Sequence, residues 1–533
     1  MTQKVLIVGW DGATWDYIDP FMEQGALPHL EALLERGTRA VLRSTRPPYT
    51  AVAWPSLVTG LSPARTGVFD GARLKPGSYE FVPANLSGYQ GIPIWQWANR
   101  FGRRAGVLNV PMTFPASPLD GYMVTGFDSP RRSSRVAFPQ GLLQRWAAQG
   151  YPYRVLEEET DLMDGQNPHH RRLGLHEFVS RWECLTLEQG RLVAWLWQTQ
   201  PVDLMFVVFS VTDSLNHRTR NLACIRKGYA AADRALGQIL EAVAEDTMVC
   251  LVSDHGSTPA CRYIALYRAL HDAGWLHFRQ EVALRFWRRL PGALGQLASA
   301  MWQRLPTRVR QIISQLLVKG DARLTVAFDT VDWDRAQVFA RTSLGPLYLN
   351  LVGRHPQGCV APEEASSLKA EVARYFLELK DPEGQPLFAR VWQREELYSK
   401  AHSKDAAPDL LLEPTRWSDH LITGYPSDPL VRSIPPEREY GTHTPDGILA
   451  LAGPGIRRGH EVSPARIMDV VPTLLAAWQL PIPVEVDGQV LQEVFVTRRE
   501  VQRIEVEVNE PVAWDGKESQ EILDRLRALG YVD

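Results

Sequence analysis

Four apolar runs along the chain each end in polar or turn residues. These runs cover residues 5–12, 204–217, 247–256 and 447–456. Continuous Val, Ile and Leu without alternation predicts strands that are buried on both faces, as in a parallel sheet. Helical patterns lie between the runs, at 28–35, 185–197 and 227–243. Strands alternating with helices predict an α/β sandwich, and in such a sheet the carboxyl ends of the strands carry the site.

The stretch 263–405 interrupts this pattern. It opens with basic, Trp-containing helical sequence and continues as strands and turns, so we expect an inserted cap region. "APDLLLEP" (407–414) predicts a return to the central sheet, and "ESQEILDRLRALGYVD" (518–533) predicts a short amphipathic helix. The predicted organisation is a discontinuous core, a cap and a tail, at 1–262 with 406–500, 263–405 and 501–533.

Composition narrows the class of protein. The 533 residues are 45% hydrophobic and 22% charged, and the net charge of −3 offers no basis for nucleic-acid binding. The five cysteines form no C-x-x-C pair, which argues against a disulfide framework and a cysteine–zinc site. The first apolar run is too short for a secretion signal, and no apolar stretch could span a membrane. We therefore expect a cytoplasmic protein.

Acidic and imidazole side chains gather where the predicted strands end. Each could be an ordinary turn, cap or structural residue. Their concentration around buried strands instead predicts one site at one edge of one sheet, together with a hydroxyl at a helix start. The set is Asp11, Thr50, Asp213, His217, Asp254, His255 and His443. Asp213 and His217 are four residues apart, so one helical turn presents both on one face. Asp and His sets match borderline divalent metals such as zinc, and paired metals suit displacement at phosphorus.

These residues stand in stretches that resemble the alkaline phosphatase superfamily. The stretches are "VGWDG", "PPYTAVAWPSLVTGLSPARTGVFD", "VTDSLNH", "VSDHG", "GTHTPDGILALAGPGI" and "IMDVVPTLLAAWQLPIPVEVDGQVL". Within that superfamily the chain is similar to the type I phosphodiesterase/nucleotide pyrophosphatase branch, and most to its group of predicted phosphohydrolases or phosphomutases. The resemblance spans residues 8 to 491 and is weakest in the insertion. It implies a three-layer α/β/α sandwich with a mostly parallel central sheet.

The resemblance also implies two metal sites and a nucleophile. One site would use Asp213, His217 and His443, and the other Asp11, Thr50, Asp254 and His255. Thr50 would form a phospho-enzyme intermediate, with two zinc ions as the expected cofactors and manganese as an alternative. The sequence around Thr50 argues against a sulfatase, because no Arg follows Thr50 in the C/S-x-P-x-R context of that group.

The chain departs from the motifs of the family it resembles at two positions that bear on substrate choice. Where nucleotide pyrophosphatases have a phosphate-contacting Asn, this chain has Gly71 after Asp70, and Thr66 replaces a frequent His. Nucleotide recognition is therefore not carried over. The expected activity is hydrolysis of small phosphate esters, with diesters favoured by the Thr nucleophile. Phosphomonoesterase, phosphomutase and phosphonate hydrolase activities remain alternatives, as does a non-catalytic, metal-stabilised binding module.

Basic residues near these motifs are further candidates. Arg46 and Arg65 flank the Thr50 segment and could bind a phosphate oxygen, or be plain surface arginines. "NPHHRR" (167–172) could reach a substrate, and His402 with Lys404 could face the cleft, although surface loops explain both. The segment 279–323 holds nine Arg or Lys and two Asp or Glu. It could be a solvated helical cap, a lid that attracts an anionic substrate, or a weak contact with an anionic membrane surface.

Overall fold

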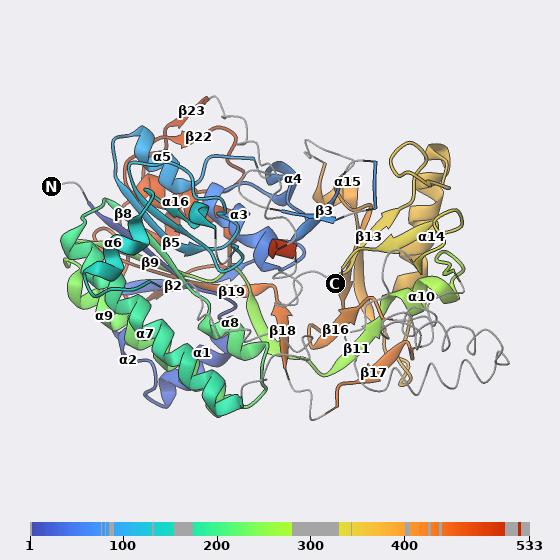
Figure 1. The fold of residues 1–533 in the computed structure, drawn as a ribbon, viewed down its shortest axis with the longest axis horizontal. Helices are drawn as coiled ribbons and strands as arrows, with labels where there is room; N and C mark the ends of the chain where they lie inside the picture. Colours follow the sequence, from blue (N-terminus) through green and yellow to red (C-terminus); the bar gives the residue numbers. More distant parts are fainter. Residues whose placement is uncertain are drawn as a thin grey trace, which may run out of the picture.

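A large, mostly parallel sheet forms the centre of the molecule (Figure 1). The computed structural model describes residues 3–75, 77–79, 81–84, 90–130, 133–153, 174–279, 330–342, 344–399, 406–424, 428–435, 440–506 and 521–523. The strands of the sheet lie in the order β20-β2-β19-β9-β1-β8-β5-β6-β7, and β21 also pairs with β2. Their bounds are β1 Val5–Trp10, β2 Gly37–Arg43, β5 Ala105–Val110, β6 Gly121–Thr125, β7 Ala137–Phe138, β8 Leu204–Phe209, β9 Met248–Val252, β19 Asp446–Ala452, β20 His460–Glu461 and β21 Ala465–Arg466.

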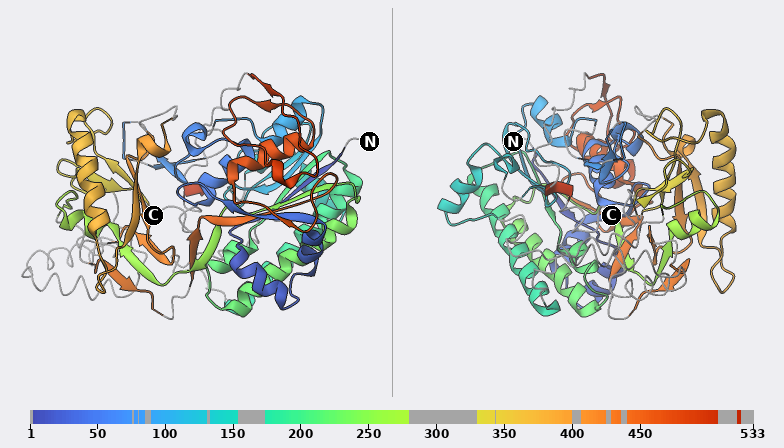
Figure 2. Two further views of the ribbon diagram at one scale, coloured as in Figure 1. Left: turned by 180° about the vertical axis from the view of Figure 1, so that it is seen from behind. Right: turned by 45° about the vertical axis from the view of Figure 1, so that its right-hand side comes forward.

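The expected burial of both sheet faces is confirmed by how β1 packs. Val5 and Ile7 point into one hydrophobic core, and Leu6, Val8 and Trp10 point into the other. Because both faces of the strand are covered, apolar residues occupy every position and no alternation is visible in the sequence. Helices cover each face (Figures 1 and 2). One face carries α1 Trp15–Glu23, α2 Pro28–Glu35, α6 Leu142–Ala148, α7 Leu175–Thr199 and α9 Leu222–Ala242, and the other α3 Thr50–Thr59, α5 Ile94–Arg100 and α16 Val470–Ala477.

The three-layer sandwich predicted from the sequence is therefore present, with one difference in strand direction. The strand predicted at 447–456 is β19, and it runs antiparallel to both of its neighbours, β2 and β9. An apolar run shows that a strand is buried on both faces, but it carries no information about the direction of the partner strands.

A second unit lies beside the central sheet (Figure 2). It contains a three-stranded sheet in the order β16-β11-β17 and a four-stranded sheet in the order β12-β13-β15-β14 around their own hydrophobic core. Its elements are β11 Arg262–Ala265, α10 Leu266–Asp272, β12 Val338–Ala340, β13 Pro346–Leu349, η4 Pro362–Glu364, α14 Ala365–Glu378, β14 Phe388–Gln393, α15 Arg394–Leu397, β15 Leu410–Pro414, β16 Asp419–Ile422 and β17 Val431–Ser433.

The prediction that 407–414 returns to the central sheet is wrong. Strand β15 pairs with β13 and β14 in the second unit, and the chain rejoins the central sheet only at β19. A short apolar strand fits either sheet equally well, so its composition could not identify the partner. The second unit thus continues past residue 405, where the sequence placed the end of the cap.

A two-stranded ribbon connects the two parts of the molecule. Strand β10, Gly256–Pro259, pairs antiparallel with β18, Gly441–Thr444. In Figure 1, β18 lies between the central sheet and the second unit. The remaining short elements are α4 Pro63–Thr66, β3 Ala72–Leu74, β4 Phe81–Pro83, η2 Ser134–Val136, α8 Val211–Asn216, η6 Ile467–Asp469, β22 Ile482–Pro483, η7 Gln492–Val494 and β23 Arg503–Ile504.

Several sequence predictions fall on residues outside the described part. These are the 167–172 motif, His402 with Lys404, and nearly all of 279–323 and of the tail helix. Of the tail, residues 521–523 are helical, and Ile522 and Leu523 are buried in the main core. Within the described residues, no helix has the length and hydropathy that a membrane span requires.

Candidate active site

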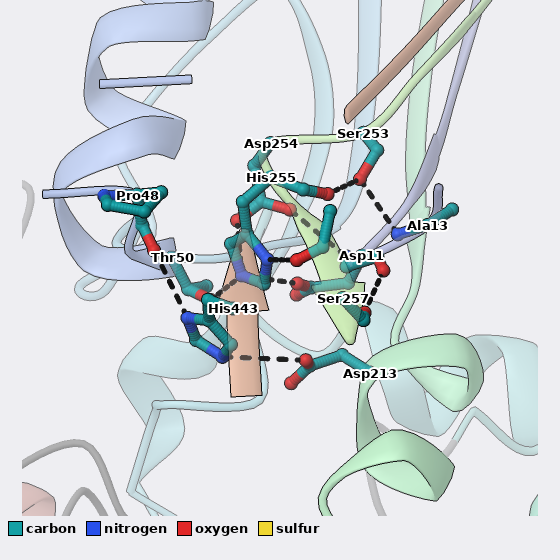
Figure 3. Close-up of polar contacts among 12 residues, drawn as sticks. Asp11, Ala13, Pro48, Thr50, Asp213, Ser253, Asp254, His255, Ser257 and His443 are labelled. Atoms are coloured by element: carbon teal, nitrogen blue, oxygen red, sulfur yellow. Dashed lines mark hydrogen bonds and ion pairs between the residues drawn. The ribbon is translucent and has the colours of Figure 1, made fainter. Parts of the chain in front are cut away.

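The central strands bring three carboxylates to one edge of the sheet. Strands β8, β1 and β9 are adjacent and parallel, so their carboxyl ends meet. Asp11 directly follows β1, and Asp254 follows β9 after a single residue. Asp213 lies in the first turn of α8, which begins just after β8. All three side chains are buried. The edge predicted from the sequence is thus the place where these carboxylates converge (Figure 3).

Short helix α8 sets the position of His217. Asp213 is in its first turn and His217 is its C-cap, so the two side chains lie on one face. His217 Nε2 is 3.3 Å from the Asp213 carboxylate. The same nitrogen is 2.9 Å from His443 Nε2. The i, i+4 spacing therefore brings both side chains into the cluster.

The β10–β18 ribbon places His443. In its register Ser257 lies opposite His443, which brings the ring of His443 onto that of His255 with centroids 3.8 Å apart. A Cβ on Gly256 would lie 2.2 Å from the carbonyl oxygen of Asp446, so this close approach of two backbones requires glycine. His443 thus joins the site through strand pairing between segments far apart in the sequence.

Thr50 is the first residue of the ten-residue helix α3. Its side chain is buried, and its Oγ1 lies 3.0 Å from His255 Nε2. Figure 3 shows Thr50 entering the cluster from the helix side, facing His255 and His443. A helix N-terminus favours negative charge, so this is a suitable position for a group that becomes anionic.

Backbone carbonyls orient both imidazoles. His443 Nδ1 lies 3.2 Å from the Pro48 carbonyl oxygen, and His255 Nδ1 lies 3.0 Å from that of Gly256. A carbonyl oxygen can only accept, so each Nδ1 carries the proton and donates it. Each Nε2 then presents its lone pair to the cluster, which is the arrangement of metal-binding histidines.

Five of the seven residues proposed from the sequence form two groups of potential metal ligands that share His255. Ligand atoms of Asp213, His255 and His443 lie within 4.8 Å of one another, and so do those of Asp11, Asp254 and His255. His255 Nε2 is 3.7 Å from Asp11 and 3.4 Å from Asp254. Thr50 contacts His255 and His217 contacts Asp213, so the fold brings all seven predicted residues together.

The electrostatics of the cluster favour a bound cation. Burial, reinforced by the negative charges of Asp254 and Asp213, raises the pKa of Asp11 well above its usual range. Burial also raises the pKa of Asp254, against the opposing effect of His255. Burial acts in the same direction on Asp213, but His217 and His443 outweigh it and lower its pKa.

Some buried carboxylate oxygens in the cluster lack a hydrogen bond. Within the described residues, both carboxylate oxygens of Asp11 lack a hydrogen-bond partner. Asp254 has a partner for one of its two oxygens and none for the other. Burying carboxylates without partners is unfavourable, and a divalent cation supplies the missing compensation. The donor set therefore fits two borderline divalent ions.

Three supporting residues were missed in the sequence. Gly12 has φ +65°, its N–H donates to Asp254 at 3.2 Å, and a Cβ there would lie 2.8 Å from Asp213. Ser253 accepts from the N–H of Ala13 at 2.9 Å, and Ser257 donates to the Gly12 carbonyl. The Asp-Gly pair directly after an apolar strand was the available signal for Gly12.

A pocket opens beside the cluster. His217, His443, Tyr49 and Pro48 line it together with residues of the second unit, including Trp417. The central core and the second unit therefore share this pocket.

The two arginines proposed as substrate contacts differ in position. Arg46 lines the pocket, where its guanidinium lies 3.2 Å from Glu413 and stacks 4.7 Å from the Trp392 ring. Arg65 pairs with Asp487 at 3.2 Å and is not among the described residues that line the pocket. Of the two, only Arg46 borders this space.

Asp70 is buried near the pocket. It directly precedes Gly71, which stands where nucleotide pyrophosphatases have a phosphate-contacting Asn. It accepts hydrogen bonds from the Gly71 N–H at 2.7 Å and from Thr342 Oγ1 at 2.9 Å. Burial raises its pKa to about 6, against the opposing charge of Arg341. Thr342 lines the pocket, and no local sequence pattern marked it as part of the site.

Comparison with known proteins covers most of the chain. A family model described as type I phosphodiesterase / nucleotide pyrophosphatase matches residues 5–446. No curated protein sequence matches the chain significantly. Human ectonucleotide pyrophosphatase / phosphodiesterase 5 superposes with a TM-score of 0.52 at 14% identity, over 93% of this chain and 100% of its own.

Two further solved structures carry ligands. An inactive form of the murine ectonucleotide pyrophosphatase / phosphodiesterase 5, in complex with AMP, superposes with a TM-score of 0.52 at 14% identity, over 92% of this chain and 100% of its own. Phosphonoacetate hydrolase from Sinorhizobium meliloti, in complex with phosphonoacetate, superposes with a TM-score of 0.53 at 16% identity, over 88% and 94%. These likenesses establish the alkaline phosphatase-like fold that the sequence predicted.

Proposed function

Because the chain belongs to the type I phosphodiesterase / nucleotide pyrophosphatase family, we propose that it is a phosphoester hydrolase with Thr50 as its nucleophile. The observation that carries this proposal is the position of Thr50 Oγ1, 3.0 Å from His255 Nε2 at the margin of three buried carboxylates. A hydroxyl in that place would be acidified by a cation held at the cluster and could then attack phosphorus as an alkoxide.

The buried cluster is proposed to hold two divalent cations, zinc in the first instance and manganese as the alternative. Asp213, His217 and His443 would hold one of them. The other would be held by Asp11, Thr50, Asp254 and His255. Bound cations of this kind lower the pKa of a hydroxyl and neutralise charge that develops on phosphate oxygens.

The residues of this chain then perform a two-step displacement. Thr50 Oγ1 forms a bond to phosphorus as the bond from phosphorus to the ester oxygen breaks, and the alcohol leaves. Water next forms a bond to phosphorus as the bond from phosphorus to Thr50 Oγ1 breaks, which releases the phosphate product and regenerates the hydroxyl. The partly positive N-terminus of α3 favours the anionic form of Thr50 in the first step. Burial of the cluster keeps bulk water away from it.

A small phosphorus-containing ester is the proposed substrate. Structures with this fold hold AMP and phosphonoacetate, which supports a ligand of that size. We favour a diester over a monoester, because Thr is the nucleophile type of the diesterase side of the superfamily. Phosphomonoesterase and phosphomutase activities use the same nucleophile and are separated from diester hydrolysis by their substrates and products.

Paired model substrates test the proposal. We expect zinc-loaded protein to hydrolyse methyl p-nitrophenyl phosphate faster than p-nitrophenyl phosphate. A faster monoester would indicate a phosphatase or a mutase, which phosphate release and isomer formation from a sugar phosphate would distinguish. Absence of turnover for both esters, with zinc or with manganese, would contradict the proposed function.

A further inference from the structure

One wall of the pocket beside the cluster is apolar. It consists of Leu344, Leu411, Leu412, Pro414, Trp417 and Leu421, which we call the apolar wall. Five of them lie in β15, in β16 or in the turn between these strands, and Leu344 lies just before β13. The same pocket is also lined by His217 and His443 of the cluster. A phosphorus atom held at the cluster therefore has one ester group within reach of an apolar surface.

Charged side chains that border the pocket are already engaged. Glu413 pairs with Arg46 and also accepts the indole N–H of Trp392 at 2.7 Å. Asp419 receives two hydrogen bonds from Arg262, at 2.8 and 2.7 Å. Among the described residues that line the pocket, Arg46 is the only lysine or arginine. The pocket thus offers little to a second anionic group.

The apolar wall is held firmly by its own sheet. Strand β15 lies between β13 and β14, and Leu411, Leu412 and Leu421 are buried in the protein. The clamp between Arg262 and Asp419 fixes the start of β16, since Arg262 also binds Asp381 at 2.9 Å. Trp417 and Leu344 are only half-buried, so these two side chains of the wall keep surface that can cover a ligand, and the indole is the larger of them.

We propose, resting on the function above, that this pocket selects phosphodiesters with an apolar ester group. An aryl or alkyl group would lie against the apolar wall while the phosphate lies at the cluster. The driving force is removal of apolar surface from water on both sides of the contact, which a methyl ester cannot supply and a charged headgroup opposes.

Binding of inert diesters tests this without turnover. Zinc-loaded Thr50→Ala protein would be titrated by calorimetry with dimethyl phosphate, methyl phenyl phosphate and methyl phosphocholine. Methyl phenyl phosphate is expected to bind at least about tenfold more tightly than dimethyl phosphate, because a phenyl ring leaves water. Equal affinities for these two, or tighter binding of the phosphocholine ester, would overturn the assignment.

Substitutions of Trp417 locate the effect. In Trp417→Ala the preference for the phenyl ester is expected to fall to about twofold or less, and in Trp417→Phe most of it should remain. Trp195→Ala is the matched control. Trp195 lies on helix α7, its half-buried indole stacks on Tyr151, and it does not line the pocket. If Trp417→Ala keeps the wild-type preference for the phenyl ester, the phenyl ring of the ligand does not bind against Trp417.

The two proposals fail in different ways. If the unmodified protein hydrolyses methyl p-nitrophenyl phosphate but shows no phenyl preference in binding, the function stands and the pocket assignment fails. If the phenyl ester binds tightly and no ester is hydrolysed, the pocket assignment stands and the function fails.

Discussion

The imidazole of His443 stacks on that of His255, with ring centroids 3.8 Å apart. His255 follows a central strand, whereas His443 arrives on the ribbon strand β18, so the two parts of the chain meet at this contact. His255 also belongs to both groups of potential metal ligands. Loss of either ring should therefore affect metal binding.

Replacing His443 should lower metal content. His443→Ala removes one donor from the Asp213 group, and we expect zinc-loaded protein to retain about one ion per chain fewer than the wild type, by elemental analysis after dialysis. His271→Ala is the control, because that exposed residue bonds the Leu276 carbonyl outside the cluster. Full zinc occupancy in His443→Ala would contradict its assignment as a ligand.

Removing the nucleophile should abolish turnover and spare the fold. Thr50→Ala is expected to reduce kcat by about three orders of magnitude or more, with zinc content nearly unchanged, because six stronger ligands remain. Ser56→Ala in the same helix is the matched control, since among the described residues its hydroxyl bonds only the Val52 carbonyl one turn back. Wild-type kcat in Thr50→Ala would exclude Thr50 as the nucleophile, and unchanged biological function would favour a binding module.

The buried carboxyl of Asp70 should make stability depend on pH. Its pKa is raised from 3.8 to about 6 on folding, mainly by burial, so the folded state binds the proton more tightly than the unfolded state does. The stabilising contribution of the protonated group is complete below about pH 4 and is lost as the pH rises through about 6. Asp70→Asn lacks this titration.

Thermal unfolding of both proteins between pH 4 and pH 7 measures the effect. The Tm of the wild type should fall relative to that of Asp70→Asn across this interval. The corresponding loss in the free energy of unfolding is roughly 1.4 kcal/mol for each unit by which folding raises the pKa of Asp70. A difference in Tm that stays constant with pH would show that Asp70 is ionised throughout.

Neutralising Glu413 should change substrate affinity more than stability. The pair with Arg46 is largely exposed on the arginine side, at 47%, and such pairs contribute little to stability. Glu413→Gln can still accept the Trp392 N–H, but it leaves the charge of Arg46 uncompensated in the pocket. We expect KM for the dianion p-nitrophenyl phosphate to fall about two- to fivefold, with Tm nearly unchanged.

The matched control for that change is Glu396→Gln. Glu396 pairs with Arg390 at 3.0 Å on the surface of the second unit and does not line the pocket. If both variants lower KM equally, the effect is one of net charge, and Arg46 is not a local determinant of anion affinity.

Much of the cluster could be predicted from local patterns. Apolar runs indicated strands buried on both faces, and polar residues after those runs indicated where Asp11, Asp213 and Asp254 would converge. The spacing of Asp213 and His217 indicated a shared helical face. These inferences succeed because strand burial and helical periodicity depend on the order of neighbouring residues in the sequence.

Other features depend on which distant segments pair, and only the tertiary structure decided them. The antiparallel direction of β19, the membership of β15 in the second unit and the route by which β18 carries His443 are all nonlocal. The contact of Asp70 with Thr342 and the apolar wall beside the cluster follow from that arrangement. An apolar strand is stabilised by burial in any sheet with a suitable face, so its sequence specifies that it is buried, whereas pairing and packing of the whole chain select its neighbours.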